Sequence, residues 1–447
     1  MPVSLAALTE ALLSAARAAG ADTADALAVS GASVSIDIRA GALEQAERSE
    51  ATEVGLRVLI GGRQACVSAS DVSPATFARL AERAVAMARE APQDPYAGLA
   101  EPGQLVQGWD LAGFELADPG DEPTAAALEQ DARVAEAAAM THAGITQVEA
   151  SAGYAERRLH LATSNGFSGG YVRTSRSISA VAFTGTGTAM ERDWAGEGRI
   201  WQADMPAAAE IGTLAATRAL QRAGATRPVT GTYPVLFDER IAASLIGHLL
   251  SAVNGASVAR GSSWARDLLG RQVLPATLSV IEDPHRPRIS GSRPFDGEGL
   301  PTARRAIVDN GILTGWTLDL ATGRQLGMPS TANASRSTSS PPSPSTSNID
   351  LTQGTATHGD LIRDMGTGLL VTSMIGSTIN PTTGDYSRGA SGFWVRNGAI
   401  SHAVNECTIA GNLRDMLLRI IPANDARSHL STRVPSILIE GMTLAGT

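Results

Sequence analysis

The chain has 447 residues, of which 43% are apolar and 18% charged, and its formal net charge at pH 7 is -9. This composition excludes a wholly disordered chain, and the length predicts two or three domains rather than one core. The acidic balance, without any basic run, disfavours direct binding to nucleic acid. No apolar run reaches the roughly 18 residues of a membrane-spanning helix, so we expect no membrane association.

The cysteines and the N-terminal residues indicate in which cellular compartment the protein resides. Cys66 and Cys407 lie far apart without C-x-x-C or Cys/His ligand spacing, which excludes a disulfide framework. The first 20 residues lack a basic region, and Glu10 and Arg17 interrupt their apolar positions. They therefore predict an amphipathic helix rather than a signal peptide, and we expect a cytoplasmic protein.

The first block of the chain predicts helix, strands and helix. A helix is expected over 5–19, followed by a half-buried strand in 33–39, where apolar and polar residues alternate. Gly61-Gly62 joins two further strands as a hairpin. Ser73 then caps a helix that has Pro74 at its first position and continues to about Glu90.

A second block repeats this pattern after a connector over 91–121, which is rich in Pro, Gly and Asp. We expect helices over 124–142 and 206–222, and the clearest turn at Asn165-Gly166. The strands expected between them are Val148–Tyr154, Arg157–Thr163 and Gly170–Phe183. Arg227 and Pro228 mark the end of this lobe.

From Tyr233 onward turns and short strands dominate, with hairpins predicted at Asn310-Gly311 and Asn397-Gly398. The predicted fold class is α+β. It consists of an N-terminal lobe of helices packed on a mostly antiparallel sheet and a β-rich C-terminal lobe with few helices. The expected domains are two α+β subdomains of one lobe, 1–95 and 96–225, and a C-terminal domain, 226–447.

A series of motifs in the C-terminal half resembles one known family. In order they are GHLLSAVNG from Gly247, EDPH from Glu282, PFDGEG from Pro294, DNGILTGW from Asp309, MGTGLLVT from Met365, GDYSRGASGFWVRNG from Gly384 and TIAGNLRDM from Thr408. Each motif is weak alone, but their order and spacing together resemble the TldD/PmbA family of peptidase-related proteins. The resemblance runs over nearly the whole chain.

Within that family the TldD branch carries a zinc motif, H-E-x-x-x-H, and the PmbA branch, also called TldE, does not. Here Ala243 and Ser244 occupy the first two places of that motif, and only His248 remains. A zinc hydrolase needs two or three ligands around an open position. The C-terminal stretch that completes the site with a cysteine in TldD-type relatives contains His429 but no cysteine. We therefore expect no catalytic residue, no metal and no cofactor in this chain, and zinc in a partner.

Two other groups of residues could carry chemistry. Glu282, Asp283, His285, Asp296 and Glu298 could form a metal site or an acid/base pair, but the surrounding Pro and Gly favour turns in which Asp binds backbone amides. Ser387, with His402 or His248 as base, does not match a nucleophile elbow. We expect instead that a substrate cleft is lined by His248, Tyr386, Ser387 and Arg388.

The segment Thr331 to Ser347, TANASRSTSSPPSPSTS, is of low complexity. Such a segment buries little and is most often a mobile surface loop, open to proteolysis. The functional alternative is a lid or a loop that grips a peptide.

What the resemblance implies is a non-catalytic subunit of a heterodimeric metalloprotease, active only with a TldD-like catalytic partner. That pair degrades or trims peptides and small unfolded proteins, including a microcin precursor and an antitoxin. Two alternatives stay open: an autonomous hydrolase with an unrecognised site, and a regulatory protein that binds DNA gyrase. A homodimer is possible when the partner is missing.

Overall fold

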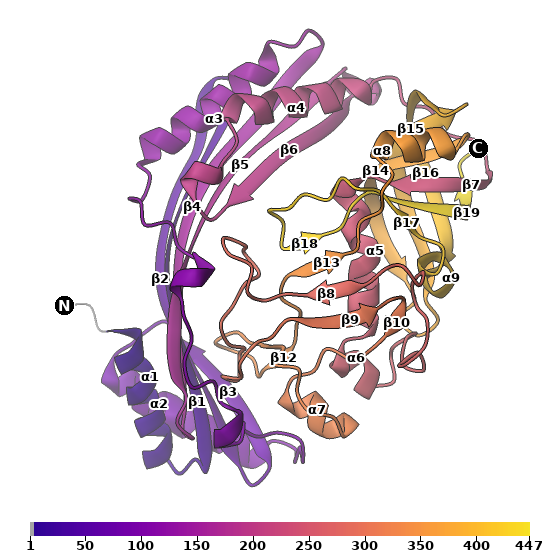
Figure 1. Ribbon diagram of the computed structural model, residues 1–447. Coiled ribbons are helices and arrows are strands. Elements are labelled where there is room, and N and C mark those ends of the chain that lie inside the picture. The colour runs from indigo at the N-terminus through magenta and orange to yellow at the C-terminus, as the bar shows by residue number, and fades with distance from the viewer. Residues whose placement is uncertain (1–3) are drawn as a thin grey trace.

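A computed structural model describes residues 4–447. Its N-terminal part is a long, curved sheet with helices on its outer face, and its C-terminal part is a β-rich lobe held on the inner face (Figure 1). We call the outer face of this sheet convex and the inner face concave. The observed fold confirms the predicted α+β class, with few helices in the C-terminal lobe.

The N-terminal sheet has six strands in the order β3-β2-β1-β4-β5-β6, all antiparallel to their neighbours. Strands from both expected subdomains, 1–95 and 96–225, form this one sheet, because β1 pairs with β4. Its strands are β1 (Thr23–Arg39), β2 (Ala42–Ile60), β3 (Arg63–Ala69), β4 (Ile145–Thr163), β5 (Ser168–Thr184) and β6 (Glu191–Arg199).

The structure corrects one strand prediction. The expected strands Val148–Tyr154 and Arg157–Thr163 are both part of β4, without a break between them. Glu156 pairs with Ala32 of β1 on one side and Thr174 of β5 on the other. Because both neighbouring strands hold this segment, it stays extended despite its weak local pattern.

Four helices cover the convex face, namely α1 (Leu5–Ala18), α2 (Pro74–Glu90), α3 (Ala125–Met140) and α4 (Ala208–Gln221). The Ser73 side chain accepts from the Thr76 amide and Pro74 begins α2, as the sequence predicts. The cores beneath the helices are rich in alanine. Small residues let the helices approach closely, and a Cβ at Gly212 of α4 would lie 1.9 Å from the Ala135 carbonyl oxygen of α3.

The connector predicted over 91–121 contains only two short 3₁₀ turns, η1 (Pro102–Gln104) and η2 (Ala112–Phe114). It contacts the C-terminal lobe: the Val106 amide donates to the Gly299 carbonyl, and the Trp109 ring meets the Phe295 ring edge-on at 4.9 Å. Two further turns flank β6, η3 (Gly187–Ala189) and η4 (Gln202–Asp204).

The C-terminal lobe is built on a second six-stranded sheet, β16-β15-β14-β7-β19-β17, and an extra pairing of β16 with β19 closes this sheet on itself. The first strand of the lobe, β7, pairs with the last, β19. Its strands are β7 (Gly231–Phe237), β14 (Gly368–Ile379), β15 (Asp385–Arg396), β16 (Ala399–Asn412), β17 (Ile421–Pro422) and β19 (Ile437–Ala445).

A smaller sheet, β10-β9-β8-β13-β18, lies between this closed sheet and the N-terminal part (Figure 1). Both predicted hairpins are confirmed, because Asn310-Gly311 and Asn397-Gly398 turn with positive φ between paired strands. The strands are β8 (Val280–Glu282), β9 (Arg305–Asp309), β10 (Ile312–Leu313), β13 (Ile349–Leu351) and β18 (Thr432–Arg433), and the helices of the lobe are α5 (Glu239–Ala252), α6 (Gly255–Ala259), α7 (Leu320–Leu326), α8 (His358–Asp364) and α9 (Leu413–Leu417).

The segment 331–347 differs from the expected surface loop. It forms a two-stranded pair, β11 (Ala334–Ser335) with β12 (Ser343–Pro344), and Asn333 and Thr338 are buried. A Cβ at Gly55 of β2 would lie 2.0 Å from the Thr338 carbonyl oxygen, so this segment packs directly against the N-terminal sheet. The expectation that it buries little is wrong, because its polar side chains find partners in the lobes that it joins.

No helix within residues 4–447 combines the length and the apolarity that crossing a membrane requires.

Candidate functional site

Helix α5 carries the remaining residue of the predicted motif. The Asp238 side chain caps its first turn by accepting from the Arg240 amide. One face of the helix is buried in the core of the lobe, through Ala242, Leu245, Ile246 and Leu249. The motif positions lie beside this face: Ala243 packs partly against the core, and the Ser244 hydroxyl donates to the Ile241 carbonyl within the helix.

His248 contacts one of the three residues that we expected beside it, Tyr386. Its ring faces the Tyr386 ring edge-on at 5.8 Å, and burial, followed by the charge of Arg388, lowers the pKa of the imidazole. Tyr386 is itself buried, so its ring belongs to the core rather than to an open surface, and burial raises its pKa to about 12. Ser387 points to the opposite face of β15 from Tyr386 and Arg388, since successive side chains on a strand alternate.

The side chains near His248 do not fit a zinc site. Its buried Nε2 has no hydrogen-bond partner within residues 4–447, and across the same residues no group of three His, Cys, Asp or Glu side chains is arranged to hold a metal. The Cys407 thiol donates to the Ala390 carbonyl at 3.2 Å inside the sheet, and burial raises its pKa to about 11. One imidazole with an alanine and a serine at the other motif places gives fewer ligands than zinc requires.

The carboxylates between Glu282 and Glu298 serve separate structural roles. Glu282 accepts from Asn333 and Ser347 and pairs with Arg305 at 2.8 Å, which fixes the segment 331–347. Asp296 accepts three backbone N–H groups, which confirms the turn interpretation. Burial, and then the charge of Asp296, raises the pKa of Glu298 well above its usual range. These groups stabilise the lobe and do not converge on a shared ligand position.

Beside α5, strand β14 offers an unpaired edge. It pairs with β7 only through Leu369 to Val371, and within residues 4–447 its continuation has no neighbouring strand on that side. Ile375, on this continuation, is 78% exposed. The edge begins at a cavity of about 580 Å³ that Ser373 lines together with Trp194 and Arg222 of the N-terminal part. An extended chain could hydrogen-bond to such an edge.

A charged cluster that the sequence did not reveal joins the lobes near the start of α5. His429 Nε2 lies 2.9 Å from Glu197 Oε2 of β6, and Arg427 bridges Glu197 at 3.0 Å and Glu239 at 2.7 Å. Burial, and then the charge of Arg199, lowers the pKa of His429, so its neutral form is favoured. The histidine that the sequence singled out therefore joins the two lobes.

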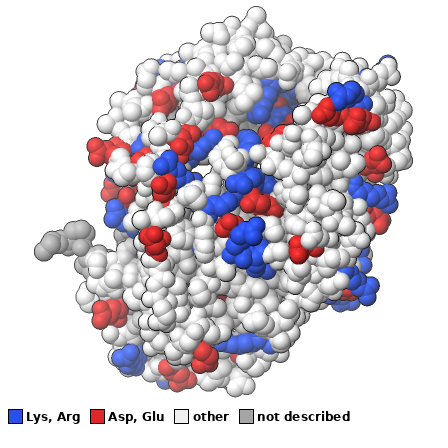
Figure 2. Space-filling model, viewed as in Figure 1, with Lys and Arg blue, Asp and Glu red and all other residues white. Residues whose placement is uncertain are grey.

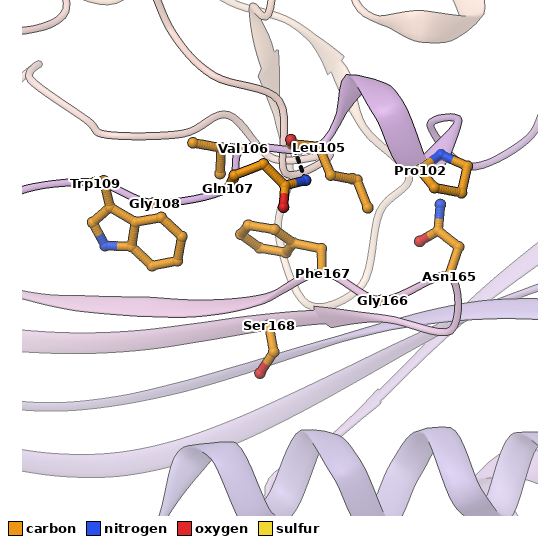
Figure 3. Close-up of a pocket in the computed structure, with 10 residues that line it drawn as sticks. All are labelled: Pro102, Leu105, Val106, Gln107, Gly108, Trp109, Asn165, Gly166, Phe167 and Ser168. Carbon is orange, nitrogen blue, oxygen red and sulfur yellow. Dashed lines mark hydrogen bonds between the residues drawn. The ribbon is translucent and has the colours of Figure 1, made fainter.

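A further cavity of about 540 Å³ lies between the connector and the β4–β5 turn (Figure 3). Connector residues from Pro102 to Trp109 form one side and turn residues from Asn165 to Ser168 the other. The Asn165 side chain is engaged within the protein, donating to Ala100 and accepting from Thr163. This cavity presents no charged side chain to a ligand.

Models of one protein family match three stretches of the chain. They are the PmbA/TldA metallopeptidase domain 1 over 24–88, the central domain over 118–223 and the C-terminal domain over 230–446. The sequence is 34% identical over 415 residues to metalloprotease PmbA from Escherichia coli O157:H7, covering 92% of this chain and 90% of the relative. A PmbA homolog from Haemophilus influenzae is 33% identical over 429 residues, covering 94% and 90% of the two chains.

Solved structures share the fold over its full extent. A protein from Bacteroides thetaiotaomicron named as a modulator of DNA gyrase superposes with a TM-score of 0.89 at 25% identity, covering 98% of each chain. TldE from Thermococcus kodakarensis superposes with a TM-score of 0.84 at 18% identity, covering 98% of this chain and 99% of the other. The chain belongs to the PmbA/TldD family and to its PmbA branch.

Proposed function

We propose that this chain is the non-catalytic subunit of a heterodimeric metalloprotease, whose TldD-like partner holds the zinc. The observation that carries the proposal is the ligand set on α5, where Ala243, Ser244 and His248 supply a single imidazole. The partner would supply the chemistry, and this chain would form part of the space that encloses the substrate. Its place of action would be the cytoplasm.

The substrates we propose are peptides and small unfolded proteins, among them a microcin precursor and an antitoxin. The unpaired edge of β14 supports this class, because backbone hydrogen bonds to a strand edge recognise an extended chain with little dependence on its sequence. The cavity at Ser373 and Trp194 gives such a chain a position between the two parts of the molecule. A folded domain would not present its backbone in this way.

Copurification combined with metal analysis tests the subunit role. A tagged chain isolated from its own cells should bring down a TldD-like protein in equal amount, with about one zinc per pair that is absent when the chain is purified alone. One tightly held zinc per isolated chain after dialysis against a mild chelator would overturn the proposal. Recovery of gyrase in place of a TldD-like chain would favour the regulatory alternative.

A restored motif separates the subunit role from an autonomous hydrolase. Ala243→His with Ser244→Glu recreates H-E-x-x-x-H ending at His248, and we expect no peptidase activity, because a third ligand and the groups that orient the imidazoles are still missing. The unaltered chain serves as the matched control. Peptide hydrolysis by the isolated, unaltered chain would show that the chain has its own catalytic site.

A further inference from the structure

A cavity of about 380 Å³ lies on the concave face of the N-terminal sheet, where β4 and β5 meet two segments of the C-terminal lobe. Four arginines line it, namely Arg157, Arg173, Arg293 and Arg336. The sequence contains no lysine, so every blue side chain in Figure 2 is an arginine, and near the centre of this view the arginines lie among Asp and Glu side chains. Four arginines around one cavity contrast with the net charge of -9 for the whole chain.

Two of these arginines face each other across neighbouring strands. Arg157 of β4 pairs in register with Arg173 of β5, and like charges directly opposite each other on a sheet repel. The Arg173 guanidinium donates to the carbonyls of Ser290 and Ser292. Arg157 is exposed and forms no ion pair with any acidic side chain in residues 4–447, so nothing within the described chain neutralises it.

The other two arginines come from the C-terminal lobe and keep buried donors free. Arg336 has a side chain that is only 2% exposed; one nitrogen pairs with Asp25, while its Nε and Nη2 find no partner within residues 4–447. Asp25 is shared with Arg57, so one carboxylate serves two guanidinium groups. Arg293 holds the Ala334 and Ser345 carbonyls and likewise leaves its buried Nε unpaired.

One carboxylate lines the cavity, that of Asp296. Its oxygens already accept the backbone N–H groups of Glu298, Leu300 and Ala334. These bonds hold the carboxylate in its turn. Asp25 pairs with Arg336 but is shared with Arg57, whereas Arg157 and Arg173 form no ion pair within residues 4–447. A bound anion would supply the missing acceptors.

We propose that this arginine cavity binds a carboxylate of a peptide, and this rests on the proposed function for the peptide nature of the ligand. Guanidinium groups present paired N–H donors that match the two oxygens of a carboxylate. The Tyr171 and Phe295 rings line the same cavity and offer an apolar surface to the adjoining side chain. That mixed lining suits an organic acid with an apolar part better than a small inorganic anion.

Calorimetric titration of the purified full-length chain tests the proposal without any partner subunit. The probes are acetyl-Leu-Ala with a free carboxylate, the same dipeptide as its amide, acetyl-Asp-Leu amide and inorganic phosphate. Arg157→Gln is the main variant because Arg157 is exposed and has no ion pair to lose in the described part of the chain. Arg158→Gln is its matched control, because Arg158 is the next residue on β4, points to the other face and pairs with Glu156 at 2.7 Å. Arg336→Met is a second variant.

Saturable binding of the free acid, at least tenfold weaker in Arg157→Gln and unchanged in Arg158→Gln, is the expected result. If only the free acid binds, the cavity recognises the C-terminal carboxylate of a peptide. If the aspartyl amide binds as well, the cavity recognises side-chain carboxylates too. Any of four results would overturn the proposal: equal binding of the neutral amide, tighter binding of phosphate, no saturable binding, or unchanged binding of the free acid in both Arg157→Gln and Arg336→Met. Copurification of the partner tests the subunit role, and calorimetry on the isolated chain tests the arginine cavity. Failure of one proposal is therefore distinguishable from failure of the other.

Discussion

The two faces of the N-terminal sheet are made from the same strands and differ in almost every other respect. On the convex face, Ala24, Ala26 and Ala28 of β1 pack beneath α1 and α2. On the concave face, the intervening residues Asp25 and Leu27 face the C-terminal lobe. Asp25 pairs with Arg57 and Arg336, and Leu27 packs in a cluster of aliphatic and aromatic side chains. One face is dry and closely packed, whereas the other carries charge.

This contrast shows how a strand divides its residues between stability and recognition. Small apolar residues at every second position let helices lie close to the sheet and give that face one arrangement. Large polar and aromatic residues at the alternate positions leave room for a cavity, and their charges are costly unless they are paired. The following substitutions test whether the concave face holds the two lobes together as this division implies.

The largest effect is expected from Asp25→Ala. Removal of this carboxylate leaves Arg57 and Arg336 without their shared, buried partner, which should lower the free energy of unfolding by roughly 3–5 kcal/mol. Chemical denaturation measures it. Asp37→Ala is the matched control on the same strand and face, because the Asp37 side chain is half-buried and, among residues 4–447, accepts a hydrogen bond only from the Ser151 hydroxyl. A loss under about 1 kcal/mol is expected there. Equal losses for both variants would contradict a special role for Asp25.

The same carboxylate predicts acid sensitivity. Burial alone would raise the pKa of Asp25, but the charges of Arg336 and Arg57 bring it below its ordinary value. The stabilisation is therefore present above the unfolded pKa of about 3.9 and is lost as the pH falls from there through the folded pKa. Asp25→Ala should show a shallower loss of stability over this acid range.

Gly55→Ala should separate the segment 331–347 from the sheet. The new methyl group would lie 2.0 Å from the Thr338 carbonyl oxygen, so the backbone must move, at a cost of roughly 1–3 kcal/mol. Limited proteolysis should leave this segment intact in the unaltered chain and cleave it in the variant. Gly198→Ala is the control, since a Cβ there meets its nearest atom at an ordinary 3.5 Å. Rapid cleavage of the unaltered chain would show that the docking is weak.

Glu298→Gln should reduce the loss of stability that accompanies a rise in pH. We expect a smaller effect here than from the substitutions above. Burial, and then the charge of Asp296, raises the pKa of Glu298, so the folded state resists its ionisation. Its contribution is present below the unfolded pKa and is lost as the pH rises through the folded pKa. The variant should lose less stability than the unaltered chain as the pH rises above the unfolded Glu pKa of about 4.3, and denaturation at a series of pH values measures this difference. Glu101→Gln, on the connector, is the control substitution of the same type at an exposed position.

The smallest effect is expected from His248→Ala, on the C-terminal side of the concave space. Assayed with its TldD-like partner, the variant should cleave peptides within about threefold of the unaltered chain, a difference under roughly 1 kcal/mol in the barrier. Leu250→Ala, two residues along α5, controls for packing of the helix. A loss of about 100-fold with the heterodimer intact would show that this subunit contributes chemistry.

Local signals predicted those parts of the fold that depend on neighbouring residues. The Ser73 cap, the Asn-Gly turns and the buried series Val34, Ile36 and Ile38 are all observed. The continuity of β4 at Glu156 and the docking of the segment 331–347 were not predicted, because both depend on strands and side chains that are distant in sequence. Sequence periodicity reports which residues share a face, and it does not report what covers that face.

The candidate site was predictable only in part. Tyr386 and Arg388 share a face of β15, and the Tyr386 ring meets His248. Ser387, which we expected in the same cleft, lies on the other face, because successive side chains on a strand alternate. For the arginine cavity one signal was present: Arg157 and Arg173 are equally distant from Asn165 in the predicted turn, which makes them cross-strand neighbours. Arg293 and Arg336 had no such signal, because only the packing of the two lobes brings them to this hairpin.

The pairing of β7 with β19 has a consequence for biosynthesis. β7 begins at Gly231 and its partner ends at Ala445, so the closed sheet of the C-terminal lobe cannot form until the ribosome has added residues far beyond β7. The N-terminal sheet, by contrast, is complete once β6 has emerged at Arg199. Chains fold as their domains become available during synthesis. The N-terminal sheet can therefore form first, and the C-terminal lobe can close against it only after β19 has been synthesised.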